Sequence, residues 1–294
     1  MLKLGIIGYP ISHTLSPQMH TAALQYLNIN GIYRAYEVKE DELIQMFNQL
    51  KDSGIKGFNV TIPHKISIIS LLDELTETAK LIGSVNTVTI TKEGKAIGEN
   101  TDIIGFWETI PNDIKQNLPN LKATIIGCGG SALAVTVALL MNKVKHLKIL
   151  GRNTAKLSLL KDFIDSRKTL LQSDTIIEKG LMDRVDLSET NILINTTPVG
   201  MYPKVDFSPV TKEEILQLPK DALIYDLIYN PQETLLLTLG KYLDRRTING
   251  VEMLIRQGAA SLGIWLEQKV APHGAMRLAV LQNTITVTNA ESND

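Results

Sequence analysis

The fold is indicated most clearly by the segment Lys122-Ala-Thr-Ile-Ile-Gly127-Cys-Gly129-Gly130-Ser-Ala132, which the apolar run Leu133–Met141 follows directly. The residues at its start predict a strand, the glycines a tight turn, and the apolar run a buried helix. This order is the fingerprint of a Rossmann-type dinucleotide-binding unit, in the form G-x-G-x-x-A. Gly127 would make the turn, Gly129 would admit the pyrophosphate, and Ala132 would let the helix pack closely on the strand.

The next predicted strand, His146–Leu150, leads into Gly151-Arg-Asn-Thr154, with Lys156 beyond. A site for NAD usually carries an acidic residue about 20 residues after the fingerprint, where it binds the ribose 2′-hydroxyl. This chain has Arg152 there, and an arginine can pair bidentately with a phosphate. Thr154 and Lys156 would add a hydroxyl and a second positive charge. The loop therefore predicts NADP, and the alternative is that Arg152 is only a solvated cation.

A lysine and an aspartate mark a second candidate site. Lys65 follows the predicted strand Gly57–Ile62, which Pro63 ends by removing a ladder donor. Asp102 follows two short polar residues and would be a natural partner for the amine. Such a pair can transfer a proton at a ligand oxygen. Taken alone, the pair is more simply interpreted as a solvated turn lysine and a helix cap, but the dinucleotide fingerprint favours a catalytic pair.

Composition agrees with an ordinary globular enzyme. The 294 residues are 44% hydrophobic, which excludes disorder and allows two domains. The net charge of −1 gives no electrostatic reason to expect nucleic acid or a membrane as partner. Cys128 is the one cysteine, and no Cys/His cluster has metal-ligand spacing, so we expect neither a disulfide nor a metal. No apolar run reaches the ~18 residues of a membrane span, and the N-terminus lacks a signal-peptide core. We expect a cytoplasmic protein.

The order of the predicted elements favours two α/β units. In the first half, strands are expected at 3–7, 33–38, 57–62 and 84–90, with 95–98 as a hairpin partner, and helices at 16–27, 41–51 and from 66 to 72. In the second half, strands are expected near 124, at 147–150, 192–195 and 223–226, with an amphipathic helix at 251–268 and a fraying tail at 283–294. The first sheet should be mostly parallel, and Ser16 should cap the first helix with Pro17 in its first turn.

Taken together, these motifs resemble those of the shikimate dehydrogenase family and its quinate-using relatives. The resemblance runs in order along nearly the whole chain. It is carried by Gly8-Tyr-Pro-Ile-Ser-His-Thr-Leu-Ser-Pro17, Asn59-Val-Thr-Ile-Pro-His-Lys65, Val85-Asn-Thr87, Asn100-Thr-Asp102, the Gly127 turn, Asn195-Thr-Thr-Pro-Val-Gly-Met201, Asp226-Leu-Ile-Tyr-Asn-Pro231 and Gly250-Val-Glu-Met-Leu-Ile-Arg-Gln257. It implies a substrate domain over 1–102, with helices from 239–294 packing back on it, a Rossmann-type NADP domain over 103–238, and a cleft between them.

The resemblance implies NADP-dependent, reversible oxidation of shikimate to 3-dehydroshikimate, a step of aromatic amino-acid and chorismate biosynthesis. Lys65 would be catalytic, with Asp102 hydrogen-bonding beside it at the reacting hydroxyl. Further substrate contacts would come from Thr14, Ser16, Thr61, Asn86, Tyr229 and Gln257. The cofactor would contact Glu77, Gly127, Cys128, Gly129, Gly130, Ser131, Gly151, Arg152, Asn153, Thr154, Lys156, Leu227 and Gly250. The expected partner is the small-molecule substrate, and the sequence leaves monomer and homodimer open.

Three positions depart from the family pattern. Thr14 stands where serine is common, which adds a methyl group to the expected carboxylate pocket, and Leu133 replaces a frequent arginine. The loop reads Gly151-Arg-Asn-Thr154 where Asn-Arg-Thr is usual. Two alternatives therefore stay open: a quinate/shikimate or related polyol dehydrogenase, and a non-catalytic NADP-binding regulator. Retention of both Lys65 and Asp102 argues against the regulator.

Overall fold

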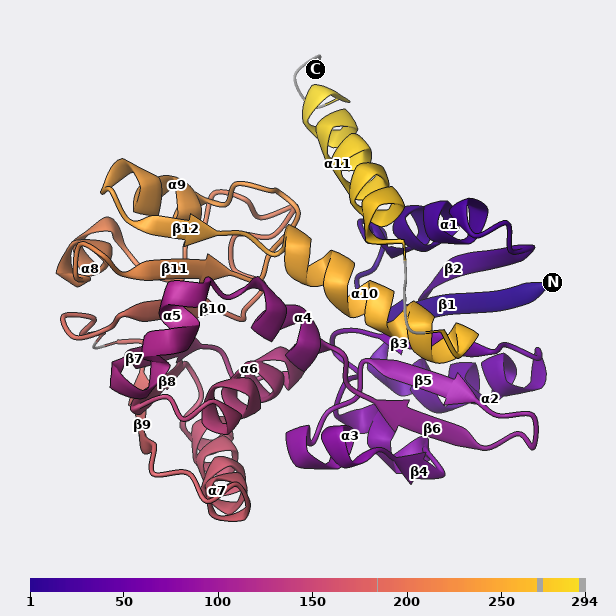
Figure 1. The fold of residues 1–294 in the computed structure, drawn as a ribbon, viewed down its shortest axis with the longest axis horizontal. Helices are drawn as coiled ribbons and strands as arrows, with labels where there is room; N and C mark the ends of the chain where they lie inside the picture. The colour runs from indigo at the N-terminus through magenta and orange to yellow at the C-terminus, as the bar shows by residue number, and fades with distance from the viewer. Residues whose placement is uncertain (184, 269–271, 291–294) are drawn as a thin grey trace. The chain divides into compact units, whose positions relative to one another are not determined.

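The computed structural model describes residues 1–183, 185–268 and 272–290 and divides into two compact units (Figure 1). Unit 1 holds Met1–Gly105 and the described residues from Leu254 on, and unit 2 holds the described residues of Phe106–Met253. Each unit contains one six-stranded sheet with helices packed on it. The expected α/β class with two units is confirmed.

The sheet of unit 1 has the order β2-β1-β3-β5-β6-β4. Its strands are β1 (Leu2–Gly8), β2 (Gly31–Glu37), β3 (Gly57–Val60), β4 (Glu74–Leu75), β5 (Thr87–Ile90) and β6 (Ala96–Glu99). β1 pairs in parallel with β2 and β3, but β5 is antiparallel to both β3 and β6. β4 is parallel to β6, so three of the five pairings are parallel and the expected mostly parallel sheet holds except at β5. β5 also forms the expected hairpin with β6, through a turn in which Gly94 has a φ of 81°.

The helices of unit 1 cover both faces of this sheet. They are α1 (Ser16–Tyr26), the 3₁₀ turns η1 (Glu40–Glu42) and η2 (Ser67–Leu71), α2 (Leu43–Asp52), α3 (Glu77–Ile82), α10 (Val251–Leu266) from Leu254 on, and α11 (His273–Ala290). One face is closed by a core that includes Phe47, Phe58 and Ile68. On the other face, Trp265 of α10 donates a hydrogen bond to Val88 O at 3.0 Å, and a side chain at Gly57 would overlap its indole ring.

Three local expectations for unit 1 differ from the structure. The N-cap of α1 is Leu15, so Ser16 is the first helical residue rather than the cap. Residues 67–71 form a 3₁₀ turn and not the start of an α-helix. The tail expected to fray from residue 283 continues as helix α11 to Ala290, and residues 291–294 lie outside the described residues.

The sheet of unit 2 is entirely parallel, in the order β12-β11-β10-β7-β8-β9. Its strands are β7 (Lys122–Ile126), β8 (His146–Gly151), β9 (Ile176–Leu181), β10 (Ile192–Asn195), β11 (Leu223–Asp226) and β12 (Arg246–Ile248). The chain runs outward from β7 in both directions, so the order reverses between β7 and β10. In doubly wound sheets, ligands bind beyond the carboxyl ends of the strands at such a switch point.

The helices of unit 2 are α4 (Asp102–Thr109) from Phe106 on, α5 (Asn112–Asn117), the 3₁₀ turn η3 (Leu118–Asn120), α6 (Gly130–Met141), α7 (Thr154–Leu170), α8 (Lys212–Gln217) and α9 (Leu235–Tyr242). α7 packs on α6, β8 and β9, whereas α9 packs on α8, β11 and β12. Because β12 pairs with β11, residues 239–253 fall in unit 2, although the sequence interpretation had grouped them with the first domain. Among the described helices, none is long and apolar enough to cross a membrane.

Candidate active site

Lys65 and Asp102 form a buried ion pair in unit 1. Lys65 Nζ lies 2.5 Å from Asp102 Oδ2, and the two residues are only 9% and 4% exposed. The interpretation of Lys65 as a solvated turn lysine is therefore wrong. Taking two charges out of water costs free energy, which their attraction and further hydrogen bonds must offset. A pair held in this way is suited to proton transfer with a ligand, because neither group is engaged by bulk water.

The backbone around Lys65 is fixed by three hydrogen bonds. His64 N donates to Thr61 O at 2.9 Å, and Val85 N donates to Lys65 O at 2.8 Å. The buried His64 ring donates from Nε2 to Val38 O at 2.7 Å. This contact gives His64 a structural role. Lys65 is thus presented from a rigid turn just after β3.

Asn86 joins this ion pair to α10. Its Nδ2 lies 2.8 Å from Asp102 Oδ1 and 3.1 Å from Gln257 Oε1, and its Oδ1 accepts a hydrogen bond from Thr101 N at 2.8 Å. Lys65, Asn86, Asp102 and Gln257 come from four segments that are far apart in the sequence. The structure therefore brings together four of the eight residues that the resemblance assigns to the substrate.

A second polar layer behind Asn86 was not identified from the sequence. Ser261 Oγ lies 2.7 Å from Thr87 Oγ1 and 3.0 Å from Asn59 Nδ2, and it donates to Gln257 O at 3.0 Å. Tyr33 OH donates to Asn59 Oδ1 at 2.7 Å. The available signal was a serine one turn after Gln257 on an otherwise apolar helix face. This layer holds the side chains in front of it in place.

Three further substrate candidates lie in unit 1 near the ends of β1 and β3. Thr14 Oγ1 lies 3.2 Å from Ser16 Oγ and accepts from Ser16 N at 3.3 Å, so these two residues form a local polar pair before α1. Thr61 follows β3, and its N–H donates to Ile7 O at 3.0 Å. Its methyl group packs where a side chain at Gly8 would stand, so glycine is needed there.

The glycine-rich turn in unit 2 has the geometry that the fingerprint predicts. Gly127 has a φ of 123°, and a side chain there would overlap Thr196 Oγ1, so only glycine fits. A Cβ at Gly129 would meet nothing within 4 Å, which leaves space for a ligand. α6 begins at Gly130, so its N-terminus supplies a partial positive charge at the turn. The buried Ala132 lies in the first turn of this helix.

Cys128 fills a small space beside this turn. A Cβ at Gly151 would lie 2.7 Å from Cys128 Sγ, so the thiol packs against the end of β8. Burial raises the pKa of the Cys128 thiol, which keeps it neutral near pH 7. Ser131 is half-buried in the first turn of α6.

The loop after β8 exposes Arg152 at the carboxyl end of that strand. Asn153 caps α7, since its Oδ1 accepts a hydrogen bond from Lys156 N at 3.0 Å. Thr154 is the first residue of α7, and both Thr154 and Lys156 are exposed. The Asn153 cap thus holds the loop in place, while the Arg152 side chain is exposed to solvent.

Leu227 and Gly250 meet beyond the ends of β11 and β12. Gly250 N donates to Ile228 O at 2.9 Å, and a side chain at Gly250 would overlap Leu227 O. Tyr229 follows in the same loop and is half-buried. Glu77 stands apart from the other cofactor candidates in the chain, because it lies in unit 1, at the start of α3, where it pairs with Lys80 at 2.7 Å.

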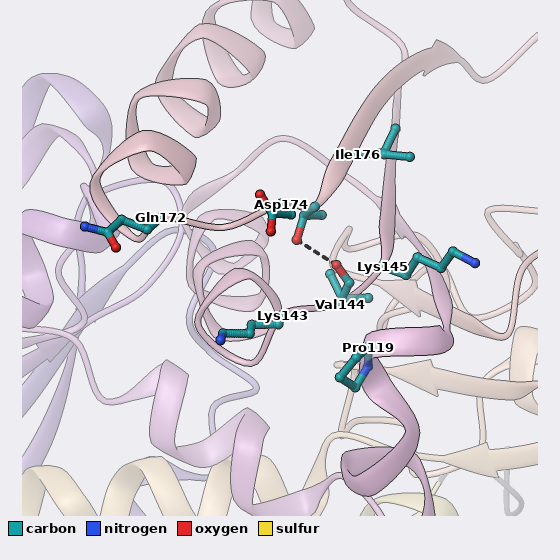
Figure 2. A pocket seen from close by; sticks show the side chains of 8 residues that line it. Pro119, Lys143, Val144, Lys145, Gln172, Asp174 and Ile176 are labelled. Carbon is teal, nitrogen blue, oxygen red and sulfur yellow. Dashed lines mark hydrogen bonds between the residues drawn. The ribbon is translucent and has the colours of Figure 1, made fainter.

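A cavity of about 300 Å³ lies at the opposite end of the unit 2 sheet (Figure 2). It is lined by Pro119, Lys143, Val144, Lys145, Gln172, Asp174, Thr175 and Ile176. These residues come just before β7, β8 and β9 or open β9, whereas the glycine turn follows β7, so the cavity is not part of the glycine-turn site. Thr175 Oγ1 donates to Val144 O at 2.6 Å within its wall. Across the described residues, no group of three or more His, Cys, Asp or Glu side chains could hold a metal ion.

Comparison with known proteins gives a consistent result. Residues 6–88 match the family model for the shikimate dehydrogenase substrate-binding domain. A curated relative from Nostoc sp., named shikimate dehydrogenase (NADP(+)), is 38% identical over 285 residues, which are 95% of this chain and 96% of the relative. A solved shikimate dehydrogenase in complex with NADP+ superposes with a TM-score of 0.82 at 38% identity, covering 97% of this chain and 96% of that one. Quinate dehydrogenase from Corynebacterium glutamicum in complex with NAD gives a TM-score of 0.80 at 27% identity, covering 96% and 99%.

Proposed function

The chain belongs to the shikimate dehydrogenase family, and we propose that it catalyses the NADP-dependent, reversible oxidation of shikimate to 3-dehydroshikimate. In a cell the reaction would run toward shikimate in the cytoplasm, as a step of aromatic amino-acid biosynthesis. The observation that carries the proposal is the buried Lys65–Asp102 pair joined to Asn86 and Gln257. A scaffold used only to bind a dinucleotide has no need for this pair.

The proposed chemistry assigns the proton to Lys65. NADP, when bound, supplies the hydride acceptor for oxidation, and its reduced form supplies the hydride for reduction. In reduction, the Lys65 ammonium would donate a proton to the oxygen that becomes the hydroxyl, and in oxidation the amine would take it back. Asp102 Oδ2, 2.5 Å from Lys65 Nζ, orients the amine and balances its charge. Asn86 Nδ2 holds the other oxygen of Asp102 at 2.8 Å, so the carboxylate cannot turn away.

Short polar side chains suit a polyol, because each can match one hydroxyl. We assign Thr61, Asn86 and Gln257 to the ring hydroxyls, and Thr14, Ser16 and Tyr229 to the carboxylate. A buried polar group left without its partner costs about 1–3 kcal/mol, so a substrate that lacks a matching hydroxyl would be rejected. Thr14 keeps a hydroxyl but adds a methyl group, which makes it the position that most directly bears on the choice between shikimate and quinate.

The cofactor assignment fits the residues that are present. The space beside Gly129 and the N-terminus of α6 suit a pyrophosphate, and the exposed Arg152 suits a 2′-phosphate. We assign the cofactor to Glu77, Gly127, Cys128, Gly129, Gly130, Ser131, Gly151, Arg152, Asn153, Thr154, Lys156, Leu227 and Gly250.

The test of the function is NADPH formation with shikimate and with quinate, repeated with NAD in place of NADP. We expect the highest kcat/KM for shikimate with NADP. A preference for quinate would reject the proposed substrate, and a preference for NAD would reject the role of Arg152. NADP binding without turnover of either acid would favour a regulator.

Replacing Arg152 by glutamine should lower kcat/KM with NADP by about 10- to 100-fold, because a charge-assisted pair with the 2′-phosphate is lost. The kcat/KM with NAD should change little, since NAD has no phosphate at that position. Arg167→Gln is the control, because Arg167 lies near the C-terminal end of α7, whereas Arg152 lies in the loop before that helix. Equal losses with NADP and NAD in Arg152→Gln would contradict the assignment.

A further inference from the structure

Asp226 is a fully buried carboxylate at the carboxyl end of β11. It accepts three hydrogen bonds from neutral donors. Asn195 Nδ2 and Ile228 N donate to Oδ1 at 3.0 and 3.1 Å, and Thr234 Oγ1 donates to Oδ2 at 2.7 Å. A buried carboxylate is costly, so its donors must be held firmly in place.

One of these donors reaches the loop after β10. Asn195 Oδ1 accepts from Thr197 N at 3.0 Å and from Thr197 Oγ1 at 2.7 Å. The preceding residue, Thr196, donates from Oγ1 to Ile126 O at 2.7 Å, and it occupies the space that a side chain at Gly127 would need. The loop after β10 is therefore tied to Asp226 on one side and to the glycine turn on the other.

A second donor reaches the loop after β11. Ile228 N is bound by Asp226, and Leu227 N donates to Asn195 O at 3.0 Å. Ile228 O in turn accepts from Gly250 N at 2.9 Å. Asp226 thus joins the loops after β10 and β11 at the level of the glycine turn, since Asn195 is in register with both Ile126 and Asp226.

The position of these loops indicates which part of a dinucleotide they would receive. A dinucleotide lies across the switch point of such a sheet, with one half on each side. Arg152 follows β8, on one side of β7, whereas Asn195 and Asp226 end β10 and β11, on the other side. If Arg152 binds the 2′-phosphate of the adenosine half, the loops held by Asp226 would receive the nicotinamide half.

We propose that Asp226 is a positioning residue for the nicotinamide half of the cofactor: it holds residues 196–199 and 227–228 in the binding shape without contacting the cofactor. The proposal rests on the cofactor part of the proposed function and is independent of the identity of the substrate. If the proposal is right, cofactor binding depends on the hydrogen-bond geometry of Asp226 and not on its negative charge.

An asparagine at this position should preserve that geometry. Its Oδ1 can accept from Asn195 and Ile228 as before, and its Nδ2 can donate to Thr234 Oγ1, because a hydroxyl both donates and accepts. Burial raises the pKa of Asp226 to about 6, which means that burial penalises the charged form, and a neutral side chain avoids this cost. Alanine, in contrast, would remove the acceptor of Ile228 N and of Thr234 Oγ1, and would leave Asn195 Nδ2 with Val199 O at 3.3 Å as its other acceptor.

The test is the Kd of NADPH, measured by its fluorescence, for wild type, Asp226→Ala and Asp226→Asn. We expect the alanine variant to bind about 10- to 100-fold more weakly, because a shift of the loops misplaces the binding groups. The asparagine variant should stay within about threefold of wild type. Thr190→Ala is the control for general loss of stability, because it removes a buried hydroxyl hydrogen bond to Thr124 at 2.7 Å, and Thr190 lies just before β10, at the opposite end of that strand from Asn195. Its Kd should stay within about twofold, as expected for an independent site.

Several results would overturn the proposal. An unchanged Kd in Asp226→Ala would exclude a positioning role, and equal weakening in the alanine and asparagine variants would show that charge is what binding requires. If Asp226→Ala does not fold, Asn195→Ala cuts the same link with Asp226 intact and should weaken NADPH binding as well; an unchanged Kd there would count against the proposal. A wild type that binds NADPH but does not oxidise shikimate would reject only the proposed reaction, whereas no binding by wild type would reject the cofactor assignment together with this role.

Discussion

Replacing Lys65 by alanine should lower kcat by about 10²- to 10⁴-fold with little change in the KM for shikimate, the usual loss when a general acid–base group is removed. In the oxidation of shikimate, Lys65 Nζ is the proposed proton acceptor. The carboxylate of Asp102 cannot take over this role, because Asn86 and its own position at the start of α4 hold it in place. The KM should change less, because Asn86 and Gln257 retain their contacts with each other.

The variant also leaves Asp102 as a buried charge without its cation, which lowers stability. Melting temperatures must therefore be measured beside the kinetics, at a temperature where the variant is folded. Lys95→Ala is the matched control, since Lys95 pairs with Glu74 at 2.6 Å in the same unit but on the surface. Partial recovery of kcat in Lys65→Ala on addition of a small primary amine would support the chemical role. A kcat equal to that of wild type would refute it.

Acidification should destabilise wild type more than a His20→Leu variant. His20 is fully buried and stacks on Tyr33 with ring centroids 4.3 Å apart, and neither ring nitrogen has a hydrogen-bond partner among the described residues. Burial lowers the pKa of His20 from 6.5 to about 3. The unfolded chain therefore binds a proton at a higher pH than the folded chain does.

Acid therefore favours the unfolded chain. The stability due to neutral His20 is fully present above about pH 6.5 and is lost as the pH falls toward about 3. Over that whole range the loss would be of the order of 4 kcal/mol, and near pH 4.5 about 2–3 kcal/mol. The measurement is urea denaturation at several pH values. His20→Leu should make the free energy of unfolding depend less on pH. Any packing cost of the substitution is the same at every pH, so it does not change this slope. His273→Leu, at the start of α11, is the control, and equal slopes for wild type and His20→Leu would contradict the prediction.

The dinucleotide unit could be predicted in detail because its determinants are local. The strand, the glycine turn and the helix are contiguous, and the need for glycine at residue 127 follows from its φ of 123°. The strands β9 and β12 were not predicted. Most residues of β9 are exposed, and β12 is short, so neither shows the apolar pattern of a buried strand. They form strands because β9 hydrogen-bonds to β8 and β12 hydrogen-bonds to β11.

The fold of unit 1 could likewise be predicted only in part. Its strands could be located from apolar runs, but the antiparallel pairing of β5 with β3 could not, because pairing direction depends on the path of the chain between them. Lys65 and Asp102 could be named as a candidate pair, whereas Ser261, Asn59 and Tyr33 could not be connected with it. Their side chains lie together only because α10 packs on the sheet beside β5.

Short contiguous patterns are enough to identify the family, the α/β class, the glycine turn and the candidate residues Lys65 and Asp102. The folded structure was needed to show that the pair is buried, that Asn86 and Gln257 converge on it, and that Asp226 joins two loops of the other unit. The physical reason is that burial and side-chain hydrogen bonds depend on residues brought together from distant parts of the chain, and a local pattern carries no information about which residues those are.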